Sequence, residues 1–390
     1  MLKVILNKNE EADILNGFPW VYSNEVNNFE GPIVSGDICE VLDNNRHFVG
    51  YGFFNANSKL MVRMLSLNQE DKIDKEFFKK RIQYALSHRN NLHFEDSNCM
   101  RLIFSEADYL PGLVVDKYDE ILVISISVLG MDNIKKVIVD ILVELLNPKG
   151  IYERSDSPSR LKEGLDIQKG YLYNEFDPKV LVNENGIQFY VDVQNGQKTG
   201  YFLDQKINRD NLKYYVKDKI VLDCFSNVGG FALNALKHGA KKVLATDISE
   251  LACSQILENA ALNNFKNIEV RCADVFELLK EEELKNQFDV IVLDPPAFTK
   301  NKETLKNAYR GYKEINMSAM KLIKSGGYLM TFSCSQLMNQ ELFIQMLKEA
   351  LKDSGRKGQF ISFNIQAPDH ITLFNNNEQL YLKEVILRIE

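Results

Sequence analysis

The run Asp223-Cys224-Phe225-Ser226-Asn227-Val228-Gly229-Gly230-Phe231 closes a strand-like stretch, residues 219–224, and opens a helix-like one, residues 229–238. Small residues at such a junction let a ligand approach the backbone, and the first turn of a helix offers free N–H groups. The pattern departs from the dinucleotide motif G-x-G-x-x-G, because an acid leads and the glycines come late. A cationic cofactor that carries an amino acid therefore suits this loop better than a dinucleotide.

Strand-like and helix-like stretches alternate from about residue 183 to the end of the chain. Alternation of this kind predicts an α/β fold with a parallel, doubly wound sheet and right-handed crossovers. Ligands of such sheets bind at the carboxyl ends of the strands. The predicted strands cover residues 219–224, 242–247, 268–272, 289–293 and 327–332, with two more at 360–365 and 380–387. The predicted helices cover residues 229–238, 249–263, 275–280, 302–324 and 339–353.

The chain before residue 183 has a different pattern. Short β-branched and aromatic runs at residues 32–34, 37–42, 47–54 and 60–65 alternate with Gly and Asn turns, which predicts a small β-barrel. Residues 71–92 have helical spacing and many lysines, typical of a solvated linker helix, with a phosphate-contacting helix as the alternative. The predicted domains are 1–68, a β-barrel; 69–98, a linker helix; 99–182, a small α+β domain; and 183–390, the doubly wound domain.

Composition limits the class of protein. With 390 residues, 45% hydrophobic and 26% charged, the chain is expected to be a globular protein of two or three domains. It lacks an apolar run of membrane-spanning length, its first residues do not have the layout of a secretion signal, and six cysteines and five histidines show no metal-ligand spacing. We therefore expect a cytoplasmic protein without metal. A net charge of −7 argues against broad nucleic-acid affinity, so any RNA contact depends on local clustering.

Acids follow three successive predicted strands. Asp223 ends the first and Asp247 the second, where an acid can accept hydrogen bonds from ribose hydroxyls. Asp274 follows the third, where it could meet an adenine amino group, although Asp247 and Asp274 each precede a helix and could instead cap it. Together with the glycine pair, the acids resemble those of class I S-adenosylmethionine-dependent methyltransferases. That resemblance implies a cofactor pocket formed by Asp223, Ser226, Asn227, Gly229, Asp247, Ile248, Asp274, Val275, Asp294 and Pro295.

Two further runs indicate the chemistry. Asp294-Pro295-Pro296-Ala297-Phe298 follows the fourth strand, and its prolines make a rigid corner that could hold a planar base while Asp294 meets a ring nitrogen or amine. A stiff turn without a ligand is the alternative. Cys334 follows the fifth strand, between two serines. A thiolate there could add to C6 of a pyrimidine and make C5 nucleophilic, whereas an isolated cysteine is usually a small buried hydrophobe.

The chain is also similar to a narrower family. Residues 309–316 (YRGYKEIN) and 331–335 (TFSCS) resemble the ribosomal RNA large-subunit methyltransferase I family, as do residues 18–22, 200–205, 367–370 and 380–383. The resemblance implies an N-terminal PUA domain that binds RNA, and S-adenosylmethionine-dependent formation of 5-methylcytosine in 23S ribosomal RNA. It implies Cys334 as nucleophile and Asp294 as the acid that orients the base. It also implies that Lys198, Thr199, Phe202 and Gln205 close over the methionine end of the cofactor, that Pro296 and Phe298 contact the base, and that Arg310 and Lys313 face RNA phosphate or solvent.

One departure from most RNA cytosine-5 methyltransferases leaves a role open. Those enzymes carry a second cysteine beside the proline motif, and this chain has none there, so Asp294, Glu314, His370 and water all stand as acceptors of the C5 proton. Two other functions are compatible with the sequence: a purine-nitrogen RNA methyltransferase that uses Asp294-Pro295-Pro296 without Cys334, and a non-catalytic RNA-binding assembly factor. A small-molecule methyltransferase would leave the N-terminal modules without a role. The family suggests a homodimer, but the sequence determines neither the oligomeric state, nor the nucleotide, nor the assembly stage of the substrate.

Overall fold

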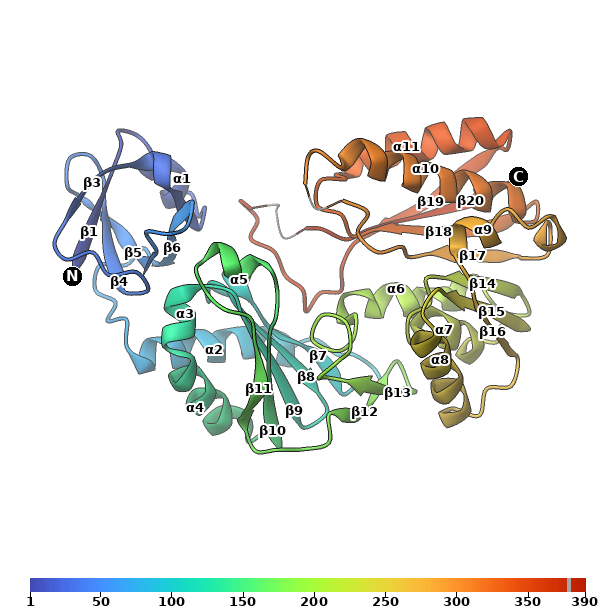
Figure 1. Cartoon of the computed structure of the whole chain (residues 1–390), viewed down its shortest axis with the longest axis horizontal. Coiled ribbons are helices and arrows are strands. Elements are labelled where there is room, and N and C mark those ends of the chain that lie inside the picture. Colours follow the sequence, from blue (N-terminus) through green and yellow to red (C-terminus); the bar gives the residue numbers. More distant parts are fainter. Residues whose placement is uncertain (300, 377–379) are drawn as a thin grey trace. The chain divides into compact units, whose positions relative to one another are not determined.

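The computed structural model describes residues 1–299, 301–376 and 380–390, which form two compact units (Figure 1). The N-terminal unit comprises residues 1–182, 191–203 and 368–376, and the C-terminal unit residues 183–190, 204–367 and 380–390. Neither unit is a single continuous stretch of chain. Within the described ranges, no helix combines the length and the apolar character needed to cross a lipid bilayer.

The first part of the N-terminal unit is a six-stranded sheet wrapped around its own core (Figure 1). Its strand order is β2-β6-β5-β4-β1-β3, and β1 and β4 are its parallel pair. The predicted run at residues 32–34 is wrong, because it lies in a loop where Ile33 and Val34 are exposed. The strands are β1 Leu2–Leu6, β2 Trp20–Tyr22, β3 Val26–Glu30, β4 Ile38–Leu42, β5 Phe48–Phe54 and β6 Leu60–Ser66; β1, β2 and β3 were not predicted from the sequence.

The second part of the N-terminal unit is a five-stranded sheet of order β11-β10-β9-β8-β7, covered by helices α2 and α4. Helix α2, Lys75–Asn90, is not a solvated linker, because Phe78, Ile82 and Ala85 are buried in this core. Charged side chains line its outer face while this apolar stripe packs inward. The remaining elements are β7 Cys99–Phe104, η2 Ser105–Asp108, β8 Leu113–Tyr118, β9 Ile121–Ile126, α3 Leu129–Asn133, α4 Lys135–Leu146, β10 Gly150–Ser155, α5 Ser159–Lys162 and β11 Gln168–Tyr173.

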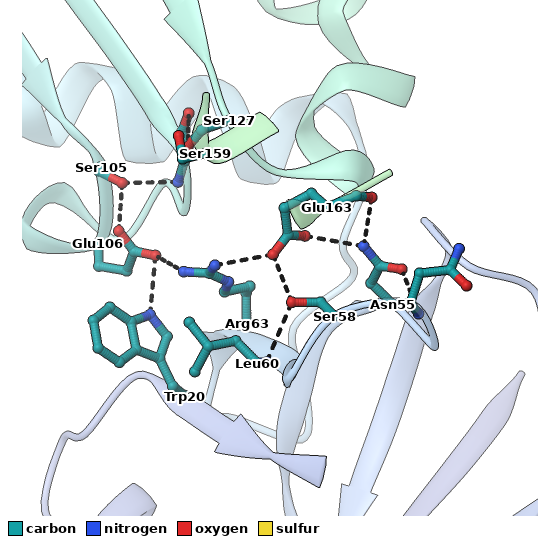
Figure 2. Close-up of polar contacts among 12 residues, drawn as sticks. Trp20, Asn55, Ser58, Leu60, Arg63, Ser105, Glu106, Ser127, Ser159 and Glu163 are labelled. Atoms are coloured by element: carbon teal, nitrogen blue, oxygen red, sulfur yellow. Dashed lines mark hydrogen bonds and ion pairs between the residues drawn. The ribbon is translucent and has the colours of Figure 1, made fainter. Parts of the chain in front are cut away.

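A buried polar network joins the two sheets of the N-terminal unit (Figure 2). Arg63, from β6, contacts Glu106 Oε1 with Nη1 at 3.0 Å and Glu163 Oε1 with Nη2 at 3.1 Å. Trp20 Nε1 donates to the same Glu106 oxygen at 3.0 Å, and Ser58 Oγ donates to Glu163 at 2.8 Å. One guanidinium thus forms ion pairs with two carboxylates whose side chains are only 6% and 5% exposed.

The C-terminal unit is a seven-stranded sheet of order β16-β15-β14-β17-β18-β20-β19, with α7 and α8 on one face and α10 and α11 on the other (Figure 1). The first five strands are parallel, as predicted, but β20 is antiparallel to both β18 and β19. Caps fix the helix starts: Ser249 Oγ accepts the Ala252 N–H and Asn339 Oδ1 accepts the Leu342 N–H. The main elements are β14 Ile220–Cys224, α7 Gly230–Lys237, β15 Lys242–Asp247, α8 Glu250–Leu262, β16 Ile268–Cys272, α9 Val275–Leu278, β17 Val290–Leu293, α10 Leu305–Leu322, β18 Gly327–Ser333, α11 Gln340–Ser354, β19 Gly358–Asn364 and β20 Lys383–Ile389.

Short elements complete the chain. Strands β12, Lys179–Glu184, and β13, Ile187–Asp192, form a separate two-stranded sheet, and each strand has residues in both units. Residues 196–200 form a turn closed by an isolated bridge between Gln197 and Gly200. After it come η3 Leu203–Gln205, α6 Lys206–Asp210 and η4 Asn211–Tyr214, and η5 Glu282–Leu284 precedes β17.

The Arg63 network makes the first prediction. Arg63→Met removes the cation and leaves two buried carboxylates facing each other, so the N-terminal unit should lose about 3 kcal/mol of unfolding free energy, seen as a lower Tm. Lys3→Ala is the control, because Lys3 meets Glu40 at 3.7 Å with a side chain 45% exposed, and it should cost less than about 1 kcal/mol. Equal losses in the two variants would contradict a special role for the network.

Candidate active site

The loop after β14 has an unusual backbone. Phe225, Asn227 and Gly229 have φ angles of 62°, 53° and 91°, so left-handed residues alternate along it. A left-handed conformation is costly for a bulky residue such as Phe225, and such strain is found where the surrounding structure holds a functional loop. The loop leads into the first turn of α7, whose N-terminal N–H groups have no partners within the helix.

Asp223, at the end of β14, is the most buried acid of this loop, with 1% exposure. Its Oδ2 accepts hydrogen bonds from the Ser226 hydroxyl and from the Ala232 N–H, whereas its Oδ1 is buried without a hydrogen-bond partner. The pKa of Asp223 is raised to about 7, mainly by burial and also by the nearby Asp294 and Asp247 carboxylates, against the hydrogen bonds from Ser226 and Ala232, which lower it. Among the residues that the structure describes, this acid therefore has no positively charged partner.

The next two strands contribute acids with different local roles. Asp247, at the end of β15, accepts the Asn227 N–H at 2.9 Å and the Ser249 N–H at 3.0 Å, so it ties the first loop to the second. The cap of α8 is Ser249 and not Asp247. Asp274 does cap a helix, because its side chain accepts the Phe276 N–H at the start of α9. Ile248 is 70% exposed, while Val275 is buried in the core of the unit.

The proline corner follows β17. Asp294 is half-buried, Pro295 is buried and Pro296 is exposed. Phe298 packs against Tyr312 of α10, with ring centroids 4.6 Å apart, and against Phe276 at 6.0 Å. Phe298 is thus anchored to the core at the base of the corner, which favours a structural role over the predicted contact with a base.

Cys334 lies one residue beyond the end of β18 and is half-buried. Its Sγ is 3.9 Å from the Pro295 carbonyl oxygen, which brings the thiol and the proline corner together. The adjacent Ser335 is hydrogen-bonded through its hydroxyl to Tyr312 Oη at 3.0 Å. The five other cysteines are also free thiols, and Cys272 is the exposed one among them.

Two residues that the sequence analysis gave no role stand beside these groups. The antiparallel pairing of β20 with β18 sets Lys383 opposite Ser333 and Glu384 opposite Phe332. Lys383 is 4% exposed and Glu384 is fully buried. The pKa of Glu384 is raised to about 8, mainly by burial and also by Asp294, although a hydrogen bond from Asn364 acts in the opposite direction. The sequence predicted a strand at residues 380–387 but gave no signal for its antiparallel pairing with β18.

Several predicted residues belong to the N-terminal unit or to helix α10. Lys198, Thr199 and Phe202 belong to the N-terminal unit, where Thr199 Oγ1 donates to Asp116 at 2.5 Å and Lys198 Nζ lies 4.6 Å from the Phe202 ring centroid. Their contact with a cofactor stays a prediction, as does that of Gln205. On α10, Lys313 pairs with Glu349 and Asp353, which favours a structural role, and Arg310 is exposed.

The structure also shows the surroundings of Glu314 and His370, two of the groups considered as acceptors of the C5 proton. Glu314 pairs with Lys280 at 3.3 Å and lines a hollow of about 640 Å³ that none of the predicted site residues lines. His370 belongs to the N-terminal unit, where its Nδ1 lies 2.8 Å from the carboxylate of Asp369. Glu314 therefore does not join the groups at the strand ends of its own unit.

The acids at the strand ends fit S-adenosylmethionine. Asp223 has an unpartnered buried oxygen and a pKa raised by burial and by two neighbouring acids, so the edge of the sheet favours a ligand with positive charge. A sulfonium and an ammonium group supply that charge. Asp223 and the α7 N-terminus would hold the amino-acid end, and Asp247 the ribose.

Comparisons with known proteins agree with this geometry. A family model for a PUA-like domain matches residues 4–67, and one for an S-adenosylmethionine-dependent methyltransferase matches residues 168–352. The chain is 39% identical over 393 residues to the ribosomal RNA large subunit methyltransferase I of Aliivibrio fischeri, covering 100% of this chain and 99% of the relative. The enzyme of the same name from Vibrio cholerae is 40% identical, with 97% of each chain covered.

Solved structures match the fold over the full length. A methyltransferase crystallised with S-adenosylhomocysteine has a TM-score of 0.85 and 21% identity and covers 100% of both chains. An S-adenosylmethionine-dependent methyltransferase from Streptococcus mutans has a TM-score of 0.84 and 20% identity, again with complete coverage. The α/β methyltransferase fold preceded by a PUA-like domain, predicted from the sequence, is confirmed, and the cofactor is S-adenosylmethionine.

Asp223 makes S-adenosylmethionine binding depend on pH. A cationic ligand lowers the pKa of a carboxyl that stands at about 7 in the free protein, so binding should release protons and weaken as the pH falls below about 7. Between about pH 8 and pH 6 we expect the Kd to rise up to about tenfold. Calorimetry in buffers of different ionisation enthalpy measures both effects, and Asp223→Asn should abolish the proton release. A Kd that does not change over this range would contradict the assignment.

Glu384 makes the stability of the free protein depend on pH. Its pKa is raised from 4.5 to about 8, so its contribution to stability is fully present below the unfolded pKa and is lost as the pH rises through the folded pKa. Glu384→Gln keeps an oxygen for Asn364 and has no proton to lose. Between about pH 5 and pH 9, the variant should lose less unfolding free energy than the wild type, by on the order of 2 kcal/mol. Thermal unfolding across this range measures the difference, and Glu283→Gln, which changes an exposed carboxyl, is the control. If stability changed with pH in the same way in wild type, Glu384→Gln and Glu283→Gln, the prediction would be wrong.

Proposed function

Because the chain belongs to the ribosomal RNA large subunit methyltransferase I family, we propose that it transfers a methyl group to C5 of a cytosine in 23S ribosomal RNA. The observation that carries the proposal is the position of Cys334. Its thiol is half-buried beyond the end of β18 and lies 3.9 Å from the carbonyl of Pro295 in the neighbouring corner. A cysteine that serves only as a small hydrophobe would sit in the core, as Cys224 does.

The proposed reaction uses Cys334 as a covalent catalyst. The Sγ thiolate adds to C6 of the cytosine, and the electron pair displaced from the C5–C6 bond makes C5 nucleophilic. S-adenosylmethionine supplies the methyl group. In this proposal Asp294, at the adjacent strand end, hydrogen-bonds to N3 or to the exocyclic amine of the ring and so stabilises the adduct. Loss of the C5 proton then expels Sγ from C6 and regenerates the aromatic ring.

The position of Glu314 reduces the number of candidates for the group that accepts the C5 proton. Glu314 pairs with Lys280 on the flank of α10, and His370 lies in the other unit beside Asp369. The proposal therefore sets Glu314 aside and retains Asp294, His370 and water.

The target cytosine must leave its stack before it can reach Cys334. We assign recognition of the surrounding RNA to the domains that precede the methyltransferase, with boundaries proposed at 1–68, 69–98 and 99–182, and catalysis to 183–390. Because the chain carries a net charge of −7, this recognition rests on local contacts and on RNA shape more than on overall attraction.

The experiment that tests the function uses 23S ribosomal RNA in which cytidine is replaced by 5-fluorocytidine. Fluorine at C5 takes the place of the proton that must leave, so wild type with S-adenosylmethionine should form a protein–RNA adduct that survives denaturation. Cys334→Ala should form none and should methylate unmodified RNA at least about 10³-fold more slowly. Cys272→Ser, which changes the exposed thiol, is the matched control and should retain both activities.

The alternatives give different results in the same experiment. Methyl transfer that persists in Cys334→Ala, without an adduct in wild type, would remove the thiol from the mechanism and indicate methylation of a purine nitrogen. Binding of RNA without methyl transfer in any variant would indicate an assembly factor. Mapping the adduct in wild type gives the modified nucleotide.

A further inference from the structure

Lys383 occupies a position that the proposed function does not use. The register of β20 against β18 sets it opposite Ser333, the last residue before Cys334. Its Nζ donates to the carbonyl oxygen of Ser335 at 2.8 Å, so the ammonium group bonds to the residue that follows the thiol. Lys383 and Ser335 thus bracket Cys334 at the strand end.

The environment of this ammonium group is unusual. Lys383 is 4% exposed, and its hydrogen bonds in the described part of the chain go to two backbone carbonyls, those of Ser335 and Tyr381 at 2.8 and 2.6 Å. A lysine is rarely buried to this extent without a carboxylate partner. Burial lowers the pKa of Lys383 to about 8, and the one electrostatic interaction that acts in the opposite direction comes from Cys334. The two groups therefore stabilise each other when the amine is charged and the thiol is not protonated.

Other titratable groups at this strand end carry no positive charge. Tyr312, from α10, interacts with Cys334 and has a pKa raised mainly by burial, so its hydroxyl is neutral near pH 7. Asp294 and Glu384 interact with each other, and both are acids. A negative charge on sulfur would be disfavoured beside these groups unless Lys383 offset it.

We propose that Lys383 is the cation that holds Cys334 as a thiolate. The proton of the Cys334 thiol passes to the neutral Lys383 amine, which gives a thiolate–ammonium pair without an external base. The thiolate then forms the Sγ–C6 bond, and breakage of that bond at the end of the reaction restores the same ion pair. Lys383 acts through Cys334 and is a positioning residue, and this inference rests on the proposed role of Cys334 as the nucleophile.

Alkylation of the full-length protein tests the proposal without RNA and without methyl transfer. Iodoacetamide reacts with the thiolate, so the rate at Cys334, followed by mass spectrometry of its peptide, gives the thiol pKa. In wild type we expect a value clearly below the free-thiol value of about 8.5. Lys383→Met should raise it by at least about one unit, which makes alkylation near pH 7 about tenfold slower and lets it recover at high pH. Lys383→Arg keeps the charge and should retain most of the low value.

Controls separate this effect from damage to the fold. Lys321→Met, which removes an exposed lysine from the same unit, should leave the rate at Cys334 unchanged. Affinity for S-adenosylmethionine reports whether Lys383→Met is folded. If that variant fails to fold, the pH profile of wild type still decides, because a Cys334 pKa at or above about 8.5 would overturn the proposal.

The two proposals fail in different ways. A low thiol pKa that depends on Lys383, with no adduct on 5-fluorocytidine RNA, would leave the ion pair in place and refute cytosine-C5 chemistry. An adduct in wild type, with the same Cys334 pKa in wild type and Lys383→Met, would keep the chemistry and refute the role of Lys383.

Discussion

Five parallel strands bring their carboxyl ends to one edge of a buried sheet, and this constraint places the reactive groups of the C-terminal unit. Every residue of β17 is buried, and its register is fixed from both sides, with Asp223 opposite Val292 and Leu293 opposite Thr331. The residues that follow these strands must therefore emerge together. Asp223, Asp294 and Cys334 come close in space through hydrogen bonding of the backbone, and they need no direct bond to one another.

Burial then sets the charge states at this edge. The surroundings disfavour ions, so Asp223 and Glu384 hold their protons to a higher pH than free carboxyls do, and Lys383 releases its proton at a lower pH than a free amine does. The three pKa values lie within about one unit of neutrality, where small changes in the neighbourhood change the protonation state. The acids at this edge favour a positively charged cofactor, whereas the Lys383 ammonium group favours a thiolate.

The N-terminal unit uses buried charge differently. Arg63 lies between Glu106 and Glu163 and forms an ion pair with each of them (Figure 2). Both ion pairs can form only in one arrangement of the two sheets. Apolar contacts also stabilise this unit; the rings of Phe53 and Phe78, for example, stack with their planes 5° apart. Such contacts bury surface but do not by themselves fix the orientation of the two sheets. The ion pairs fix that orientation, because a guanidinium bonds to carboxylates in a fixed geometry.

The sequence by itself determined the alternating α/β order, the parallel core of the sheet, and the acids and thiol that follow its strands, because these depend on local periodicity and on residues next to one another in the chain. Only the tertiary structure decided the direction of β20 and the strands with which it pairs. Its pairing with β18 joins residues about fifty positions apart, and a strand's direction and neighbours are not encoded in its own residues. Tertiary contacts in the N-terminal unit likewise buried one face of α2, a helix that its lysines suggested was solvated. The pairing of β20 placed Lys383 beside Cys334, where burial and charge give the lysine a role that its position in the sequence could not indicate.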